Sequence, residues 1–412
     1  MKILLPTGAA ICGLFLVVDP AFAQTWTPAS LPSEHWQAVA SSADGSKLIA
    51  GGYRIYCIST NSGSTWITNT EPQAGSENGS WYCIASSADG TKYVAINYTS
   101  IWVSTNSGTT WLSNNVPGAS FFASVALSAD GNKLVVGDGK ESSPGLIYTS
   151  TNSGVTVTPT MAPTNNWVSV ASSADGIKLA AAATINSQGG GLIYASTDSG
   201  LTWTLTGAPT NNYWAAVASS ADGSKLVAAS GSSYVLSEAY GGVYTSTNFG
   251  MTWTSNNVPA AQWESVASSA DGTRLVAVAI EPMGWIYTST NSGTTWISNN
   301  VPNDNWWLSV ASSADGGKLV VAPLEDQSSN PQPIYTSQTT PAPSINLTPA
   351  NGNLTLAWIV PSMNFVLQQN LDLTTTNWTD LTDAPTLNLT NLQDEVVLLP
   401  TNSSGFYRLK TP

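Results

Sequence analysis

Short apolar runs separated by small polar turns fill most of the chain, and no long stretch has the period of an amphipathic helix. Residues 263–279, "WESVASSADGTRLVAVA", hold two such runs on either side of the turn "ADG". Residues 286–296, "IYTSTNSGTTW", add a third run and a second turn before a last short run. Each unit therefore predicts four short β-strands joined by tight turns.

This unit occurs seven times along the chain. The turn aspartates mark the copies and lie 41 to 49 residues apart: Asp44, Asp89, Asp130, Asp175, Asp222, Asp271 and Asp315. Four short strands in about 45 residues are the size of one β-propeller blade. The repeat therefore predicts an all-β, seven-bladed β-propeller over residues 24–338.

The seventh copy is incomplete, because Tyr335-Thr336-Ser337 runs into "QTTPAPS" without the usual Thr-Trp. A matching piece stands near the other end of the chain. Residues 25–36, "TWTPASLPSEHW", align with residues 252–263, "TWTSNNVPAAQW". We therefore expect the N-terminal strand to complete the last blade, which removes an unpaired sheet edge.

The run Ser289–Trp296 resembles the Asp-box, or bacterial neuraminidase repeat, of sialidases, some endoglucanases, sortilin-type receptors and photosystem assembly-factor-like propellers. The resemblance implies a β-turn between the third and fourth strands of each blade. This chain departs from the family by carrying asparagine where aspartate is usual, except at Asp198. Turn chemistry accounts for the box, since Asn binds backbone N–H groups, Gly adopts a left-handed conformation and Trp fills space. The box therefore predicts a structural role rather than an active site.

The two ends of the chain differ from the repeats. Residues 1–23 predict a secretory signal peptide, with Lys2, an apolar run and small residues at Ala21 and Ala23. The apolar run is too short to span a bilayer, so we expect no membrane insertion and a secreted, periplasmic or cell-surface location. Residues 339–412 alternate in short strands and predict a small C-terminal β-sandwich-like domain.

Charge and cysteine content narrow the partners and the stabilising bonds. Only 9% of the residues are charged and the net charge is −13, which argues against nucleic acid and anionic membranes. After removal of the signal, the cysteines are Cys57 and Cys83. They predict either one bridge between adjacent blades or two free thiols.

The two faces of the predicted ring differ in length variation and in charge. The "ADG" turns and the boxes form one face, the constant face, and the links between blades lie on the opposite, variable face. Cations three residues after each turn aspartate belong to the constant face, where we expect Asp–Lys pairs across each turn: Lys47, Lys92, Lys133, Lys178, Lys225, Arg274 and Lys318. Eleven carboxylates predict an acidic variable face: Glu34, Glu71, Glu77, Asp138, Glu141, Glu238, Glu264, Glu281, Asp304, Glu325 and Asp326.

An aromatic residue begins the first strand of every copy: Trp36, Trp81, Phe122, Trp167, Trp214, Trp263 and Trp307. Such regular spacing favours wedges between blades over a platform for sugar rings. Residues of the variable face that break the repeat are the ligand-binding candidates. They are Tyr213, Trp214, Tyr234, Tyr240, Trp285, Trp306, Glu238, Glu281 and Asp304.

These features predict an exported, non-catalytic binding or scaffold propeller that recognises a glycan or a protein on its variable face. The alternative is a glycoside hydrolase or lyase that uses two carboxylates roughly 5–10 Å apart. A sialidase is excluded, because the resemblance implies three substrate-binding arginines and the propeller contains Arg54 and Arg274 alone. With His35 as the one histidine and no EF-hand spacing, we expect no metal and no cofactor.

Overall fold

The computed structural model describes residues 2–3 and 24–411. Within that span it leaves out residues 33, 73–80, 99, 117, 141–142, 185–189, 211, 232–239, 282–283, 300, 302–304, 327–330, 341–342, 351–352, 362, 373 and 399–404. The described residues form strands and turns without a helix, which confirms the all-β prediction. In this part of the chain, therefore, no helical segment has the length and apolarity that crossing a bilayer requires.

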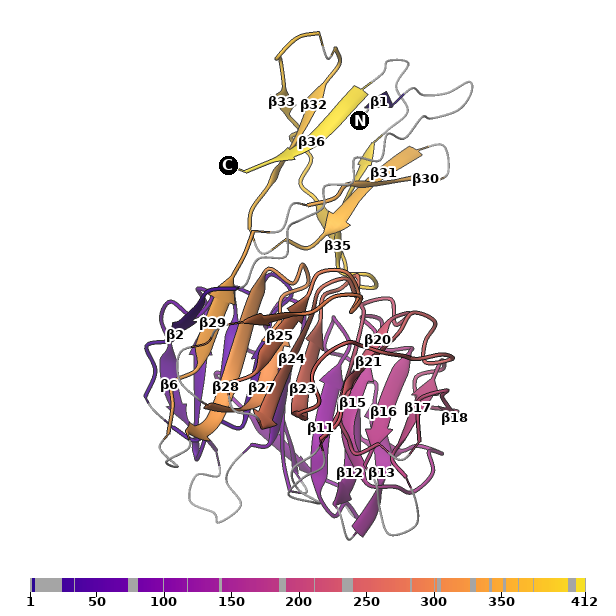
Figure 1. The fold of residues 1–412 in the computed structure, drawn as a ribbon. Helices are drawn as coiled ribbons and strands as arrows, with labels where there is room; N and C mark the ends of the chain where they lie inside the picture. The colour runs from indigo at the N-terminus through magenta and orange to yellow at the C-terminus, as the bar shows by residue number, and fades with distance from the viewer. Residues whose placement is uncertain are drawn as a thin grey trace.

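Residues 26–338 form seven antiparallel sheets of four strands, which we number in chain order (Figure 1). Sheet 1 contains β3 (Ala38–Ser41), β4 (Leu48–Gly51), β5 (Ile55–Ser59) and β6 (Ile67–Thr70). Sheet 2 contains β7 (Cys83–Ser86), β8 (Tyr93–Asn97), β9 (Ser100–Ser104) and β10 (Leu112–Asn115). Sheet 3 contains β11 (Phe122–Leu127), β12 (Leu134–Lys140), β13 (Ser143–Ser150) and β14 (Thr158–Pro159). Sheet 4 contains β15 (Trp167–Ser172), β16 (Leu179–Ala183), β17 (Leu192–Ser196) and β18 (Thr204–Leu205).

The remaining three sheets repeat this pattern. Sheet 5 contains β19 (Trp214–Ser219), β20 (Leu226–Ser230), β21 (Val243–Ser246) and β22 (Thr254–Ser255). Sheet 6 contains β23 (Gln262–Ser268), β24 (Leu275–Glu281), β25 (Ile286–Ser289) and β26 (Ile297–Asn299). Sheet 7 contains β27 (Asn305–Ser312), β28 (Lys318–Asp326), β29 (Tyr335–Gln338) and, as its outer strand, the N-terminal β2 (Trp26–Pro28). In β2, Trp26 lies opposite Ser337 and Pro28 lies opposite Tyr335, as the sequence match predicts.

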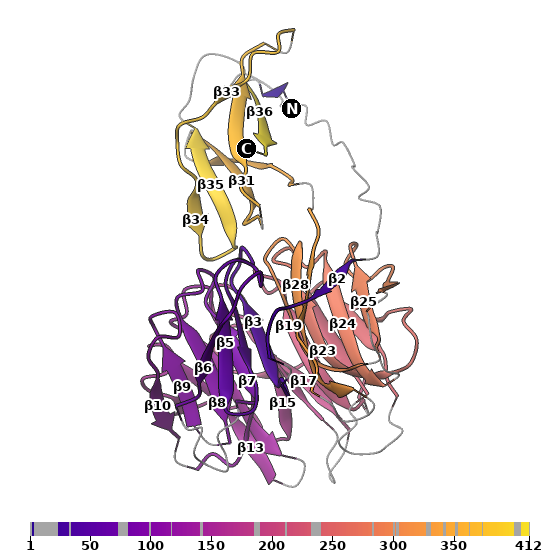
Figure 2. The ribbon, with the colours of Figure 1, turned by 90° about the vertical axis from the view of Figure 1, so that its left-hand side faces the viewer.

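The sheets stand side by side around a common centre (Figure 2). Residues at the ends of all seven first strands line a central channel. The first strand of each sheet contacts the first strands of both neighbours, and β27 of sheet 7 contacts β3 of sheet 1, so the ring is closed. A separate apolar cluster fills each interface between adjacent sheets. Burial of apolar surface between the sheets therefore holds the ring together.

Hydrogen bonds between the "ADG" turns run around the inner rim of the constant face. The N–H of each turn alanine donates to the carbonyl of the next turn alanine over 2.6 to 2.8 Å. The last donor, Ala314, returns to Ala43, so the bonds form a closed circle. We call these residues the alanine ring: Ala43, Ala88, Ala129, Ala174, Ala221, Ala270 and Ala314.

The constant-face cations reach the neighbouring sheet instead of their own turn, which corrects the expected Asp–Lys pairing. Nζ of Lys47 donates to the carbonyl of Asp89 over 2.8 Å, and Lys178 makes the same bond to Asp222. The aliphatic stem of Lys47 lies against Gly90, where an added Cβ would come within 2.7 Å of it. Since Gly90 has a φ of +62°, this turn requires glycine for conformation as well as for space.

The box turns satisfy their own polar groups. In residues 59–66, Oδ1 of Asn61 accepts the N–H of Thr65, Ser59 Oγ accepts the N–H of Gly63, and the Trp66 indole donates to the Gly63 carbonyl. The same pattern of bonds recurs at Asn106, Asp198, Asn248 and Asn291. Asn152 keeps the turn, although Val157 stands in the place of the tryptophan. The boxes are therefore complete as turns without a ligand.

The first-strand aromatics are wedges between sheets. All seven are at most 1% exposed, and each lies in one of the interface clusters. In sheets 3 to 7 the wedge meets the third-strand tyrosine of its own sheet at 5.3 to 5.9 Å between ring centroids, edge to face. This packing excludes the sugar platform for these rings.

Cys57 and Cys83 are free thiols rather than a bridge. Cys57 points into the interface between sheets 7 and 1, whereas Cys83 packs into the interface between sheets 2 and 3. The two thiols therefore face different neighbours, and a disulfide would require the sheets to move. Burial raises the pKa of both thiols.

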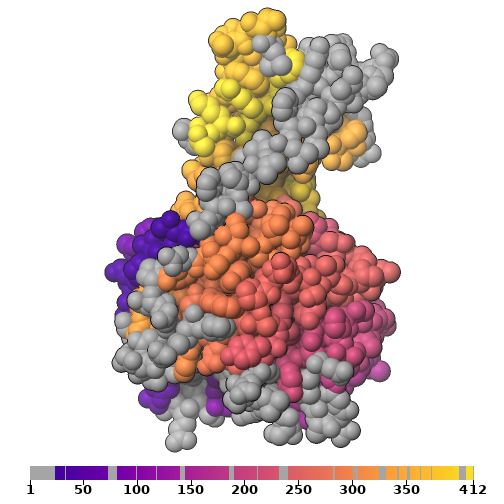
Figure 3. Space-filling model, viewed as in Figure 1, coloured from indigo at the N-terminus to yellow at the C-terminus, as the bar shows by residue number. Residues whose placement is uncertain are grey.

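The C-terminal segment, which we call the tail, forms one further four-stranded sheet and three strands of another, whose fourth strand is the N-terminal β1. One contains β30 (Asn346–Ala350), β31 (Asn353–Ile359), β35 (Gln393–Leu398) and β34 (Thr386–Asn388). The other contains β1 (Lys2–Ile3), β36 (Gly405–Lys410), β32 (Val366–Asn370) and β33 (Thr379–Asp380). The tail stands on one side of the ring (Figure 3). Val360, Ile359 and Leu392 pack on the alanine ring, so the tail covers the constant-face end of the channel.

Candidate binding face

The sequence candidates lie at different depths, and several fall outside the described residues. Tyr240 is 49% exposed, whereas Tyr213, Trp306 and Glu281 are half-buried. Tyr234, Glu238 and Asp304 lie outside the described residues. Tyr213 and Trp306 each directly precede a wedge aromatic, so they occupy one repeat position at the variable-face end of the first strand.

One candidate is a core residue and another packs against the core. Trp214 is 0% exposed between sheets 4 and 5, so its prediction as a ligand contact is wrong. Its ring meets Tyr244 at 5.3 Å and would reach a ligand only if the sheets separated. Trp285 packs on the interface cluster of sheets 5 and 6, with 6.3 Å between its ring and that of Trp263.

The variable face is less acidic than its carboxylate content suggests, because three of the described carboxylates are withdrawn into the ring. Asp138 is 1% exposed and accepts the N–H groups of Ser120 and Phe121 and the Ser120 hydroxyl. Glu71 is 3% exposed, and burial raises its pKa to about 9. Burial likewise raises the pKa of Glu264 to about 7. The sequence could not reveal this, because composition counts charges without their depth.

An aromatic cluster that the candidate list omits joins sheets 2 and 3. Tyr82, Tyr98 and Phe121 are all half-buried, and each pair of rings lies 5.2 to 5.3 Å apart between centroids. The bonds from Ser120 and Phe121 to Asp138 fix the link that carries Phe121. Phe121 holds the same repeat position as Tyr213 and Trp306. The signal in the sequence was the aromatic doublet, which occurs at residues 121–122, 213–214 and 306–307.

One residue after each wedge aromatic, the first strand bulges. In sheets 3 to 7 the pairing register with the second strand skips this residue, as at Glu264 between Trp263 and Ser265. In sheet 1 the N–H of Gln37 donates to the carbonyl of Gly51, which is already the partner of Ala38. In sheet 2 the N–H of Tyr82 likewise donates to Ile96, which is the partner of Cys83. We call these seven half-buried residues the bulge ring: Gln37, Tyr82, Ala123, Val168, Ala215, Glu264 and Leu308.

The bulge changes the alternation of side chains along the first strand. Trp263 packs toward sheet 5, whereas Ser265 faces sheet 7 and its hydroxyl accepts the N–H of Val310. Glu264 between them belongs to neither row, because an inserted residue breaks the alternation of a strand. Of the bulge ring, Val168 packs on the cluster between sheets 4 and 5, and Tyr82 packs on Tyr98 and Phe121.

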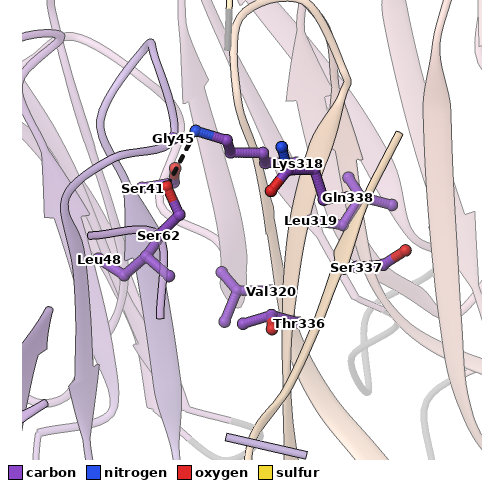
Figure 4. Close-up of a pocket in the computed structure, with 10 residues that line it drawn as sticks. All are labelled: Ser41, Gly45, Leu48, Ser62, Lys318, Leu319, Val320, Thr336, Ser337 and Gln338. Atoms are coloured by element: carbon purple, nitrogen blue, oxygen red, sulfur yellow. Dashed lines mark hydrogen bonds between the residues drawn. The ribbon is translucent and has the colours of Figure 1, made fainter. Parts of the chain in front are cut away.

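Four cavities among the described residues lie away from the bulge ring. A crevice of about 40 Å³ lies between sheets 1 and 7, where Lys318 Nζ donates to Ser62 Oγ over 2.9 Å (Figure 4). Smaller crevices occupy the corresponding places between sheets 5 and 6 and between sheets 6 and 7, so this feature belongs to the repeat. A cavity of about 160 Å³ lies in the channel, lined by first-strand serines and alanines and by Leu392 of the tail. The tail therefore packs over this cavity at the constant face.

Comparisons with known proteins support the fold. No protein-family model matches the chain, and no characterised protein matches it by sequence. Among solved structures, YCF48 bound to D1 peptide is similar, with a TM-score of 0.55 and 13% identity over 77% of this chain and 97% of that one. YCF48 from Cyanidioschyzon merolae has a TM-score of 0.56 and 15% identity over 76% and 98%. Hydrazine synthase of Kuenenia stuttgartiensis has a TM-score of 0.56 and 12% identity over 78% and 99%. The closed ring and these likenesses show that the chain has a β-propeller fold.

Proposed function

We propose that the chain is an exported, non-catalytic binding protein, a seven-bladed Asp-box propeller whose variable face holds a segment of a partner protein. The observation that carries the proposal is the difference between the two ends of the channel. The constant-face end is built from identical turns and covered by the tail. At the other end, the bulge ring and the aromatic cluster present different side chains from equivalent positions.

A protein partner fits this surface better than a glycan. Sugar rings stack on open, flat aromatic faces, whereas Tyr82, Tyr98 and Phe121 pack edge-on or tilted against one another. Such a cluster offers an apolar, half-buried contact of the kind that anchors protein interfaces. The solved likeness with a bound D1 peptide supports peptide binding by this fold.

The hydrolase alternative requires a second carboxylate near a buried acid. Glu264 has the raised pKa of a general acid, but burial is the cause and no neighbouring charge among the described residues contributes. Glu71 follows sheet 1, so sheet 7 lies between it and Glu264 in the ring. Asp138 is fully engaged in holding its link.

The test selects peptides from a phage-displayed random library on the purified full chain and measures their affinity by calorimetry. We expect the double variant Tyr82→Ala, Phe121→Ala to weaken the selected peptides at least tenfold. Met251→Ala, at a 74% exposed constant-face residue, is the matched control and should leave affinity unchanged. Peptides that bind both variants equally would refute the site.

Two further measurements separate the alternatives. A glycan array on the same protein would favour the glycan if it yields binders that Tyr82→Ala abolishes while the peptide library yields none. Reducing-sugar release that Glu264→Gln abolishes would establish the hydrolase. Export is tested by sequencing the N-terminus of protein from the native host, where we expect Gln24 as the first residue.

A further inference from the structure

The tail contains one long strand whose outer edge is mostly unpaired. β36 pairs with β32 along one side, over residues 406–410. On its other side the described residues supply β1 alone, which lies opposite Gly405 and Phe406 (Figure 1). In the described part of the chain, residues 407–410 therefore form a sheet edge with no strand beside it.

The pairing pattern shows which backbone groups point out from this edge. The carbonyl of Leu367 in β32 accepts the N–H of Leu381, so Leu367 faces β33 and forms a non-hydrogen-bonded pair with Leu409. Because the two kinds of pair alternate in an antiparallel ladder, the even-numbered residues of β36 are the ones that bond to β32. The N–H and C=O groups of Tyr407 and Leu409 therefore point away from β32, toward the open edge.

Other edge strands of the described sheets are protected in ways that β36 is not. The outer strands of the propeller sheets, like β33 and β34 of the tail, are two to four residues long. β30 of the tail is longer but contains Pro349. Very short edge strands and proline both discourage the addition of another strand. β36 has six residues and no proline, and β1 already adds to it as an antiparallel strand.

Side chains give this edge one apolar face and one cationic face. The residues whose backbone points outward pack their side chains on the apolar cluster of the tail. Arg408 and Lys410, which supply all the positive side chains of residues 339–412, are exposed on the opposite face. Neutral groups contact Arg408, since its Nε donates to Gln368 over 2.8 Å and its guanidinium lies 4.2 Å from the centre of the Trp378 ring. Both cations can therefore meet carboxylates of an adjacent strand.

From this edge we infer that β36 binds an extended acidic segment of another protein, which adds to the tail as an antiparallel strand. Its backbone bonds to Tyr407 and Leu409, while acidic side chains at alternate residues lie opposite Arg408 and Lys410. Those positions form non-hydrogen-bonded pairs, in which side chains approach most closely and opposite charges are favourable. A second copy of β36 fits poorly, because the cations of both copies would share one face.

This site lies on the tail and goes beyond the proposed function, although one detail rests on it. Export as proposed removes residues 1–23, and β1 with them, so that the open edge then extends to Gly405. The full chain and the chain that begins at Gln24 are therefore both tested. Sequencing of the native N-terminus decides export separately.

The probes are three acetylated hexapeptide amides that alternate valine with glutamate, with glutamine or with lysine. Calorimetry measures their affinity for both chains. We expect the glutamate peptide to bind at least about tenfold more tightly than the other two, because only its charges complement the edge. Binding by both chains, or by the chain from Gln24 alone, supports the inference, whereas binding by neither overturns it.

Variants at the edge separate backbone pairing from charge. Leu409→Pro removes an outward N–H without removing a bond to β32, and Leu409→Ala is the matched control, since both lose the leucine side chain. We expect Leu409→Pro to bind the glutamate peptide at least about tenfold more weakly than Leu409→Ala. Lys410→Glu, at an exposed residue, should weaken that peptide about threefold.

Equal affinity of the two Leu409 variants, or equal binding of the three peptides, would overturn the inference. A dimer of the full chain that Leu409→Pro dissociates would assign the edge to a second copy and overturn it as well. The double variant Tyr82→Ala, Phe121→Ala should leave binding of the glutamate peptide unchanged, because this site is on the tail. Failure of the variable face and failure of this edge are therefore distinguishable.

Discussion

The same strands build both ends of the central channel, but equivalent residues are identical at one end and variable at the other. At the constant face every sheet contributes a Ser-Ala-Asp-Gly turn, and seven equivalent hydrogen bonds join the alanines into a circle. At the variable face the same strands bulge at one equivalent residue, but that residue is Gln, Tyr, Ala, Val, Ala, Glu or Leu. Within a repeat, positions that stay identical build the ring, and positions free to differ are available for recognition.

Carboxyl groups on the two faces also differ in pKa. Burial works to raise the pKa of Asp44, but bonds from Ser42 and Ser46 and the charge of Lys318 outweigh it, so the pKa lies below its usual value. Glu71 is more deeply buried and accepts one long bond, from the N–H of Trp81 over 3.4 Å, so burial prevails there. Asp44 is therefore an ionised partner of the fold, whereas Glu71 is protonated near neutral pH.

The largest difference in the free energy of unfolding is expected between substitutions at two adjacent residues of sheet 7. Trp307 is a wedge with 0% exposure, and Leu308 is a half-buried member of the bulge ring. We expect Trp307→Ala to lower the free energy of unfolding by about 3–5 kcal/mol and Leu308→Ala by no more than about 1 kcal/mol. Chemical denaturation measures both. Comparable losses would contradict the division between ring-building and free positions.

The next largest effect is expected in the pH dependence of stability that Glu71 causes. Its pKa in the folded protein is about 9, against an ordinary value of 4.5. Between these values the folded chain keeps a proton that the unfolded chain releases, so stability falls as pH rises through this window, by up to about 1.4 kcal/mol per pH unit. Glu71→Gln removes this loss and should exceed the wild type by up to about 3 kcal/mol at pH 7.

Unfolding of both proteins from pH 4.5 to 9 measures this difference. Four turn aspartates, Asp44, Asp89, Asp130 and Asp222, should act in the opposite direction, because their pKa is lowered in the folded protein. A lowered folded pKa stabilises above the unfolded pKa, and that stability is lost on acidification. Glu281→Gln is the control for removing a half-buried carboxylate of the variable face. A Glu71→Gln profile parallel to the wild type would show that Glu71 is ionised in the fold.

A smaller effect is expected where the tail meets the alanine ring. Val360 is 8% exposed in that contact, whereas Val397 of the tail is 54% exposed. An aspartate at residue 360 would be buried without a partner, so Val360→Asp should weaken tail docking by about 2 kcal/mol. Limited proteolysis between the ring and the tail should accelerate for Val360→Asp alone. Equal cleavage of Val360→Asp and Val397→Asp would show that this contact does not hold the tail.

The smallest effect is expected for a single lysine hydrogen bond between adjacent sheets. Lys178→Met keeps the stem over Gly223 but removes the bond to the Asp222 carbonyl. We expect a loss of about 0–1 kcal/mol, because the charge is at the surface. Thermal unfolding measures this loss of stability. A loss above about 2 kcal/mol would show that the lysine bonds between sheets contribute more to closing the ring.

The sequence predicted the features that recur from repeat to repeat. Strand spacing, the self-contained box turns and the wedge role of residues such as Trp263 follow from local patterns that the structure contains. The bulge was missed because it depends on the pairing register of two strands, which one strand does not reveal. The sequence nevertheless shows one variable residue between the wedge and the next residue, which is a serine, an alanine or, in sheet 2, a cysteine.

Contacts between distant segments were the other features that the sequence left open. Nothing in the local pattern indicates that Val360 and Leu392 reach the alanine ring, or that Lys47 bonds to the next sheet. The burial of Glu71 likewise depends on how a link folds back, with its N–H bonded to the Arg54 carbonyl. Single-strand periodicity carries no information on such long-range packing.

Pairing of β2 with β29 also sets an order of events during synthesis. Trp26 emerges early from the ribosome, but Ser337, its partner, is made some three hundred residues later. Until then the ring is an open arc with the flank of its seventh sheet uncovered, a state that favours misassembly. A circularly permuted gene that places residues 24–30 directly after residue 338 would give β2 a neighbouring partner, and should refold faster than the natural order.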